Sequence, residues 1–193
     1  MIFWLKTRRA FTVLPVSLGV YAVLLAFVGD VAVFLPSLVG SHQVALSLFV
    51  PISIVAGLTY SLESRIAAAE VAGTRSVVRM DISFILAVVA VSGMVAFVIG
   101  QATTDPQTDA TGRNVAFLTG LMLCGRVFVG DRAVLIPVAW TLSVVLTGFR
   151  PTGDPYPWTI IPEIASSPFA AAVAAVTLAI GLTAQPYKSR RIS

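Results

Sequence analysis

The sequence predicts an all-α integral membrane protein, and two features of its composition support that prediction. Of its 193 residues, 57% are apolar and only 11% are charged, and the mean hydropathy is +0.92. A soluble domain contains ~25% charged residues. The few charges form short clusters between long apolar runs, which is typical of a chain that crosses a bilayer several times.

The same composition excludes several other classes of protein. The formal net charge is +4, but a nucleic-acid-binding domain needs its cations gathered on one exposed face. A single Cys cannot form an internal disulfide, and a single His makes a zinc site improbable. Cys124 lies in an apolar run, which favours a small buried hydrophobe. Without a linker or a fixed repeat, we expect one domain over 1–193.

Six apolar segments approach the ~20 residues that a membrane-spanning helix needs. They are residues 10–35, 42–60, 82–100, 115–129, 133–149 and 169–184. The first follows Lys6, Arg8 and Arg9, but its apolar stretch is longer than the ~7–15 residues of a signal peptide, so we expect a retained span. Only residues 130–132 separate the fourth and fifth segments, so five spans is the alternative.

Individual residues add detail to these spans. We expect Pro15, Pro51 and Pro137 to kink the first, second and fifth spans. Ser41-His42 at the start of the second span is interpreted as a helix cap and an interfacial His, because neighbouring residues at a helix end cannot easily form a nucleophile–base pair. In the sixth span, small residues recur at steps of four and favour close packing on another helix, although an Ala-rich helix without a special partner is the alternative. They are Ala171, Ala175 and Ala179.

The distribution of charge predicts the orientation. With the N-terminus in the cytoplasm, six spans place eleven cations and four acids inside, and two cations and five acids outside. Cytoplasmic loops are enriched in Lys and Arg. We therefore expect both termini inside, in a multi-pass protein of the cytoplasmic membrane. Trp4 and Tyr187 at the inner ends, and Tyr156 and Trp158 in an outer loop, fit the aromatic belts of the two interfaces.

Two of the connecting segments are informative. Between spans two and three, we expect a cytoplasmic helix over 61–73, capped by Ser61 with Glu63 in its first turn. It is either a surface connector or a docking helix for a cytoplasmic partner. The outer loop 150–168 contains five prolines, which prevent a long helix, and its apolar residues predict an interfacial or re-entrant segment. The other outer loop, 101–114, is expected to be solvated.

The motifs of common enzymes are absent from the sequence. It contains no G-x-x-x-x-G-K-[ST], no H-E-x-x-H and no G-x-S-x-G, so we expect no enzyme activity, cofactor or metal on this chain. Ionisable residues within spans are functional candidates by default. We expect Asp30 either to face a substrate pathway or to lie at the headgroups. Arg126 either lines such a pathway, pairs with Asp131, or snorkels to the inner surface, which is the simplest expectation.

Several short matches, together with the layout of the spans, give a resemblance to a known family. The matching pieces are the amphipathic N-terminus 3–11, Glu63-Ser64-Arg65, Ala69-Glu70, Arg75, Arg79, Arg113-Asn114, Pro157-Trp158 and Pro162-Glu163. In these the chain resembles the permease subunits of ABC-2-type ABC transporters, especially short actinobacterial ones. The resemblance implies that six spans form half of a transporter and that 61–73 is the coupling helix. The importer loop pattern is not matched, since no Leu-Pro follows Gly73, which favours export.

We therefore expect the permease subunit of an ABC exporter, with ATP hydrolysis on a separate chain. The resemblance implies that cytoplasmic ABC ATPase subunits and a second or related permease are its partners, in addition to membrane lipids. The residues expected to couple to the ATPase are Glu63, Arg65, Glu70, Arg75 and Arg79. The alternative is a membrane protein without transport activity, such as an immunity or scaffold protein. An intramembrane enzyme has the least support, because no His, Cys or carboxylate cluster shares one membrane depth.

Overall fold

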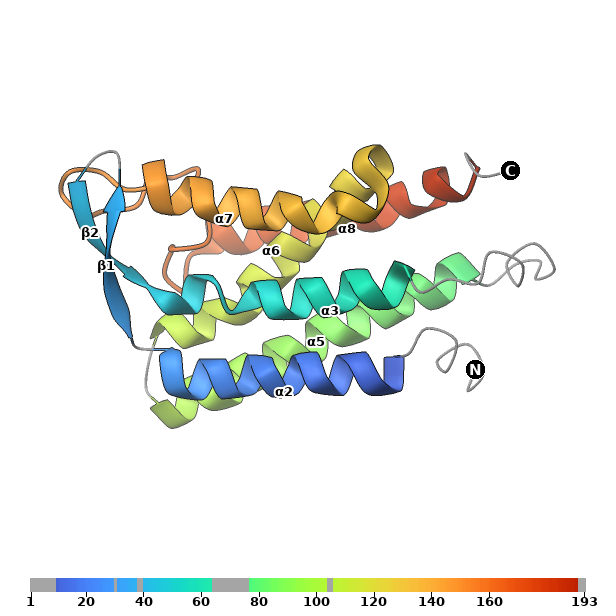
Figure 1. Cartoon of the computed structure of the whole chain (residues 1–193), viewed down its shortest axis with the longest axis horizontal. Coiled ribbons are helices and arrows are strands. Elements are labelled where there is room, and N and C mark those ends of the chain that lie inside the picture. Colours follow the sequence, from blue (N-terminus) through green and yellow to red (C-terminus); the bar gives the residue numbers. More distant parts are fainter. Residues whose placement is uncertain (1–9, 30, 38–39, 64–76, 104–105, 191–193) are drawn as a thin grey trace.

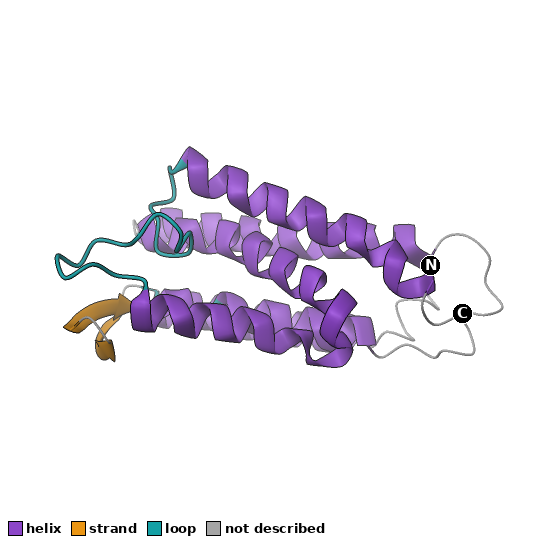
Figure 2. Cartoon of the chain, turned by 90° about the horizontal axis from the view of Figure 1, so that it is seen from above, coloured by secondary structure: helices purple, strands orange, loops and turns teal. Residues whose placement is uncertain are grey.

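The chain forms a bundle of helices lying side by side, shown in the computed structural model in Figures 1 and 2. The structure describes residues 10–29, 31–37, 40–63, 77–103 and 106–190. Within them are six α-helices, which confirms the expected helical class. They are α2 (Ala10–Val28), α3 (Pro51–Glu63), α5 (Val77–Thr103), α6 (Pro106–Val129), α7 (Leu135–Thr147) and α8 (Pro168–Arg190).

Among the described residues, three helices are long and apolar enough to cross a bilayer. They are Leu46–Glu63, Val78–Thr103 and Pro168–Gln185. Two shorter apolar helices, Thr12–Val28 and Arg132–Thr147, accompany them. Many large apolar side chains face outward, among them Phe27 at 77% and Phe128 at 86% exposed. An apolar exterior of this kind suits a lipid environment, because soluble monomers expose only small apolar patches.

Helix α6 lies at the centre of the bundle and contacts α3, α5, α7 and α8. The first turn of α2, the last turn of α3 and the last turn of α8 lie at one end of the bundle, which we call the α3 end (Figure 1). At the opposite end lie a β-hairpin, the last turn of α5, the first turn of α6 and the loop that follows α7 (Figure 1). The core between the helices is apolar. Its fully buried side chains include Leu25, Ile54, Leu58, Ile85, Leu118 and Leu123.

Glycines allow several helices to approach one another closely. A Cβ on Gly120 of α6 would lie 2.6 Å from the backbone nitrogen of Leu178 in α8. A Cβ on Gly112 would lie 2.8 Å from the Cα of Gly93 in α5. In lipid, where tails are as apolar as the helices, backbone approach at small residues is a main source of helix association.

The expected bounds of the first two spans are wrong. Helix α2 ends at Val28 instead of Leu35, and α3 begins at Pro51 instead of His42. Between them, β1 (Ala32–Ser37) and β2 (Gly40–Ala45) form an antiparallel hairpin, followed by the 3₁₀ turn η1 (Leu46–Leu48). Strand β1 carries the apolar residues Val33, Phe34 and Leu35, whereas β2 contains Ser41, His42 and Gln43. An apolar run such as that of β1 does not by itself distinguish strand from helix.

Two residue-level expectations change with the hairpin. Ser41 lies in β2 and therefore caps no helix. Pro51 is the first residue of α3, where its missing N–H costs nothing, so it starts the helix instead of kinking it. Pro137 lies in the first turn of α7. Of the three prolines, Pro15 lies well inside its helix.

The later segments also differ from expectation in detail. The predicted solvated loop 101–114 is mostly helical, since α5 continues to Thr103 and α6 starts at Pro106. Proline suits the first position of a helix. The negative charge of Asp109 in the first turn is stabilised by the positive end of the helix dipole. Gly130, at a φ of 60°, follows α6, and the 3₁₀ turn η2 (Gly130–Val134) joins it to α7. The fourth and fifth predicted segments therefore belong to separate helices.

The small-residue stripe of α8 lies on a different face from the predicted one. Ala171, Ala175 and Ala179 are exposed, whereas Ala170 and Ala174 are buried. A Cβ on Gly181 would lie 2.8 Å from the Gly120 carbonyl oxygen of α6. The periodicity was therefore the right kind of signal, but in this Ala-rich helix two neighbouring stripes are equally small, and the sequence does not tell which one packs inward.

Candidate functional site

Arg126 is the most buried ionisable side chain of the candidate set. It lies in the last turn of α6 and is 2% exposed. Its Nη2 donates a hydrogen bond to the carbonyl oxygen of Leu62 at 2.9 Å. Leu62 belongs to the last turn of α3, where carbonyls lack a partner within the helix. The guanidinium therefore caps α3 from a neighbouring helix, and its positive charge faces the negative end of that helix dipole.

This burial corrects the expectation that Arg126 snorkels to the membrane surface. A snorkelling side chain would keep its charged head in water, whereas this one ends within the protein against the α3 backbone. The expected pairing with Asp131 lies outside the side chains that the structure describes. A role of Arg126 in a substrate pathway remains a prediction.

Other expected charged residues gather at the same end of the bundle. Glu63 is the last residue of α3 and is half-buried. Arg79 lies in the first turn of α5 and is exposed, and Asp81, half a turn later, is 4% exposed. Because α3, α5 and α6 contact one another, the α3 end of the bundle combines buried charges of both signs.

The rest of the expected coupling segment lies outside the described residues. This holds for Arg65, Glu70 and Arg75, and Asp30 is outside them as well. The expected start of a separate helix at Ser61 is wrong, because Ser61–Glu63 continue α3 and Ser61 is fully buried. The hydropathy of the sequence falls after Tyr60, but α3 continues to Glu63, and segment 64–76 follows it.

A second cation holds the opposite end of α6. Arg113 donates hydrogen bonds to three carbonyl oxygens of the loop after α7: those of Ile160 at 3.1 Å, Glu163 at 2.7 Å and Ile164 at 2.8 Å. Asn114 donates a fourth bond from Nδ2 to the Ile161 carbonyl at 2.8 Å. The loop is thereby fixed to α6 at four points.

This loop contains an unusual backbone conformation. Ile160 has a φ of 54°, which is rare for a β-branched residue and costs of the order of 1–3 kcal/mol. Arg113 binds the carbonyl of that same residue, so it offsets the strain. Burial lowers the pKa of the Arg113 guanidinium, and the nearby Glu163 carboxylate opposes that shift. Residues Thr159 to Ile161 are buried, as a re-entrant loop covered by protein requires.

Several contacting residues were missed by the sequence analysis. Gln185 of α8 is 8% exposed and donates to the carbonyls of Gly181 at 3.1 Å and Leu123 at 3.4 Å. A lone Gln near the end of an apolar helix was the available signal. Trp140 of α7 makes edge-on contacts with Phe117 and Trp158, at ring-centre distances of 5.7 and 6.0 Å.

Taken together, the described contacts are attachments between charged or polar side chains of α6 and backbone carbonyls of other elements. Each end of α6 uses an arginine to bind the backbone of another element, α3 at one end and the 160–164 loop at the other. Within the described residues, no three His, Cys, Asp or Glu side chains come close enough to hold a metal ion. Comparisons of the chain with models of protein families, with curated proteins and with solved structures found no match.

Proposed function

We propose that this chain is the membrane-spanning permease subunit of an ATP-driven exporter of the ABC-2 type, with ATP hydrolysed on a separate cytoplasmic chain. One observation carries the proposal. The buried Arg126–Leu62 hydrogen bond ties α6 to the last turn of α3, where the chain enters the expected coupling segment. A rigid attachment at this point is what a force-transmitting segment requires.

The proposed mechanism follows from this attachment. Segment 64–76 joins the end of α3 to the start of α5, and both helices contact α6. A displacement of the segment by a closing ATPase would therefore act on α3 and α5 together. Packed cores respond to such a displacement by rigid-body movement, because they are not continuously deformable. Glu63, Arg65, Glu70, Arg75 and Arg79 would form the contact with the ATPase.

The proposed orientation places the α3 end of the bundle in the cytoplasm. Arg79, Arg126 and Arg132 lie at this end of the described structure, as does the end of α8 with Arg190. Asp109, Asp154 and Glu163 belong to the opposite end. This sorting of charge supports six spans with both termini inside, because positive residues are retained on the cytoplasmic side.

Affinity purification from the source cells tests the proposed function. The full-length chain, carrying a C-terminal tag, is expected to retain an ATPase that contains a P-loop, identified by mass spectrometry. The double variant E63K/E70K is expected to lose that ATPase while its own expression and insertion are unchanged. V23W, a substitution at an exposed position of α2 away from the segment, serves as the control and keeps the ATPase.

A contrary result would favour the non-transport alternative. If the wild-type chain retains no P-loop ATPase under conditions that preserve a known ABC transporter of the same cells, the permease assignment fails. If the ATPase is retained equally by E63K/E70K, the proposed docking residues are wrong even though the assignment stands.

A further inference from the structure

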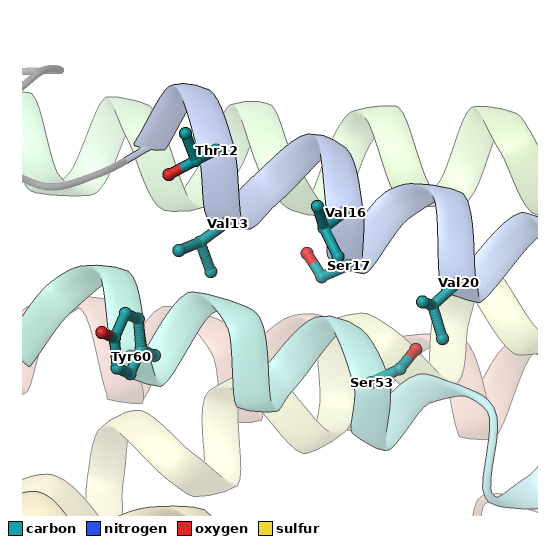
Figure 3. Close-up of a pocket in the computed structure, with 7 residues that line it drawn as sticks. All are labelled: Thr12, Val13, Val16, Ser17, Val20, Ser53 and Tyr60. Carbon is teal, nitrogen blue, oxygen red and sulfur yellow. The ribbon is translucent and has the colours of Figure 1, made fainter.

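A groove on the outside of the bundle runs between α2 and α3 along about half of α2 (Figure 3). Its volume is about 460 Å³. The wall on the α2 side consists of five residues on one face of the helix, which are Thr12, Val13, Val16, Ser17 and Val20. Val16 and Val20 are 65% and 45% exposed, so the groove opens outward to the surroundings of the bundle.

The other wall and the floor come from contacts with α3. Ser53 and Tyr60 of α3 face the groove, with Tyr60 near Thr12 and Ser53 near Val20 (Figure 3). A Cβ on Gly57 would lie 2.6 Å from Ser17, so the two helices touch between these positions. The groove is therefore shallow, and the contact between Gly57 and Ser17 forms its floor.

The chemistry of the groove favours an apolar occupant. The hydroxyl of Ser17 donates to the Leu14 carbonyl at 3.0 Å, and the hydroxyl of Ser53 donates to the Val50 carbonyl at 2.8 Å. Because both hydroxyl protons are already used within their own helices, neither serine needs a polar ligand. The remaining lining is mostly valine, so the groove suits a hydrocarbon chain.

The position and length of the groove indicate one leaflet of the bilayer. From Thr12 to Val20, it extends ~12 Å along α2 at 1.5 Å per residue. Half of the hydrocarbon core is ~15 Å thick. The groove begins in the first turn of α2, which is at the α3 end of the bundle, and it ends near the middle of that helix. It therefore lies in the leaflet at the α3 end. An acyl chain of a lipid in that leaflet matches this length.

Charge complementarity identifies the headgroup. The exposed Arg79 lies at the same end of the bundle, in the first turn of α5, which contacts α2. Cationic segments at a membrane surface attract anionic lipids. We propose that the α2–α3 groove binds one acyl chain of an anionic phospholipid of this leaflet. The site depends on membrane insertion and not on transport, so it stands or falls separately from the exporter assignment.

Native mass spectrometry of the full-length chain, with phosphatidylglycerol and phosphatidylcholine as probes, tests the site. Wild type is expected to retain phosphatidylglycerol in preference to phosphatidylcholine. V16W fills the groove and is expected to lower phosphatidylglycerol affinity at least about tenfold. Removing two methylenes of the acyl chain from an apolar site is already enough for a change of that size. V23W is the matched control, because it lies two helical turns further on the same face of α2, is 56% exposed, and does not line the groove. If V16W is not produced, V20W replaces it.

Four results would overturn the proposal. Unchanged phosphatidylglycerol binding by V16W or its replacement shows that the groove is not the site. An equal loss in V23W shows that the lipid is a general annular one. If wild type retains phosphatidylcholine as well as phosphatidylglycerol, the site does not prefer anionic lipids. A dimer that dissociates in V16W without a change in bound lipid would identify a second copy of the chain as the occupant.

Discussion

At the scale of single residues, Arg126 shows how an almost fully buried cation is accommodated between helices. Burying a charge is costly unless other groups compensate it. Here the guanidinium meets the Leu62 carbonyl at the C-terminal end of α3. That end carries the partial negative charge of the helix dipole, which is felt within the last turn. The placement therefore compensates the cation and satisfies an end carbonyl of the helix at once.

Substitution of Arg126 is expected to destabilise the bundle. R126M leaves the Leu62 carbonyl without this donor inside the protein, at a cost of about 1–3 kcal/mol. R126K keeps a donor and a charge but loses the planar fork, so its loss should be smaller. The midpoint of thermal unfolding in detergent measures both, with R132M as a control because Arg132 is exposed at the same end of the bundle. Equal midpoints for R126M and R132M would contradict the structural role.

The two arginines of α6 also show what a sequence reveals about a site. Arg126 was marked in the sequence as a charge within an apolar run, where charges are costly, whereas Arg113 appeared only in the family resemblance. The partners of both were not identified, because Arg113 and Arg126 bind backbone carbonyls, and every residue carries one. The partner residues lie 47 to 64 positions away along the chain, so only the fold brings them together.

At the scale of elements, α6 and α8 share the most extensive contact of any two helices in the described bundle. Gly120 and Gly181 lie against each other's helix, with no space for a Cβ on either. Gly93 in α5 has open space at the position of a Cβ, although it also lies inside a helix. All three glycines are therefore helical, but only Gly93 has space for a side chain.

Replacing these glycines by alanine should therefore have opposite effects. G181A forces the Gly120 carbonyl away from α8, and overpacking of this kind costs about 1–3 kcal/mol. G93A meets nothing and gains about 0.5–1 kcal/mol from the better helix propensity of alanine. Thermal unfolding of the two variants in the same detergent should give shifts of opposite sign. A lower midpoint for G93A than for G181A would mean that α6 and α8 do not pack as described.

The sequence predicted elements well where a single physical property decides them. The segments that became α5, α6 and α8 were located because uninterrupted apolar runs favour helices in a membrane. The hairpin Ala32–Ala45 was missed because its first strand is as apolar as the preceding helix, and hydropathy does not reveal pairing between strands. Likewise, the inward face of α8 was not decided by spacing, since Ala170 and Ala171 begin equally small stripes.

At the scale of the whole molecule, α6 connects the two ends of the bundle. Arg126 binds α3 at one end, and Arg113 and Asn114 bind the 160–164 loop at the other. Because α6 also contacts α5, α7 and α8, a shift of the α3 end has a continuous packed route to the opposite side. Spatial continuity alone does not establish coupling, but it defines where coupling is to be measured.

The exporter assignment depends on the orientation of this bundle in the membrane, and that orientation is directly measurable. The native Cys124 is removed by C124A, and a single cysteine is then placed at either end of the bundle. Ser166 is exposed in the loop before α8, and Ser189 lies near the end of α8. Since the cations cluster at the end of Ser189, the positive-inside rule places that end in the cytoplasm.

A membrane-impermeant maleimide is therefore expected to label S166C in intact cells and to label S189C only after permeabilisation. The C124A parent, which carries no cysteine, measures the background. Labelling of S189C in intact cells with S166C protected would mean that the bundle is inverted. The expected coupling segment would then face away from any cytoplasmic ATPase, and the exporter assignment would fail together with the orientation. Labelling of both in intact cells would mean that α8 does not cross the membrane, which contradicts six spans.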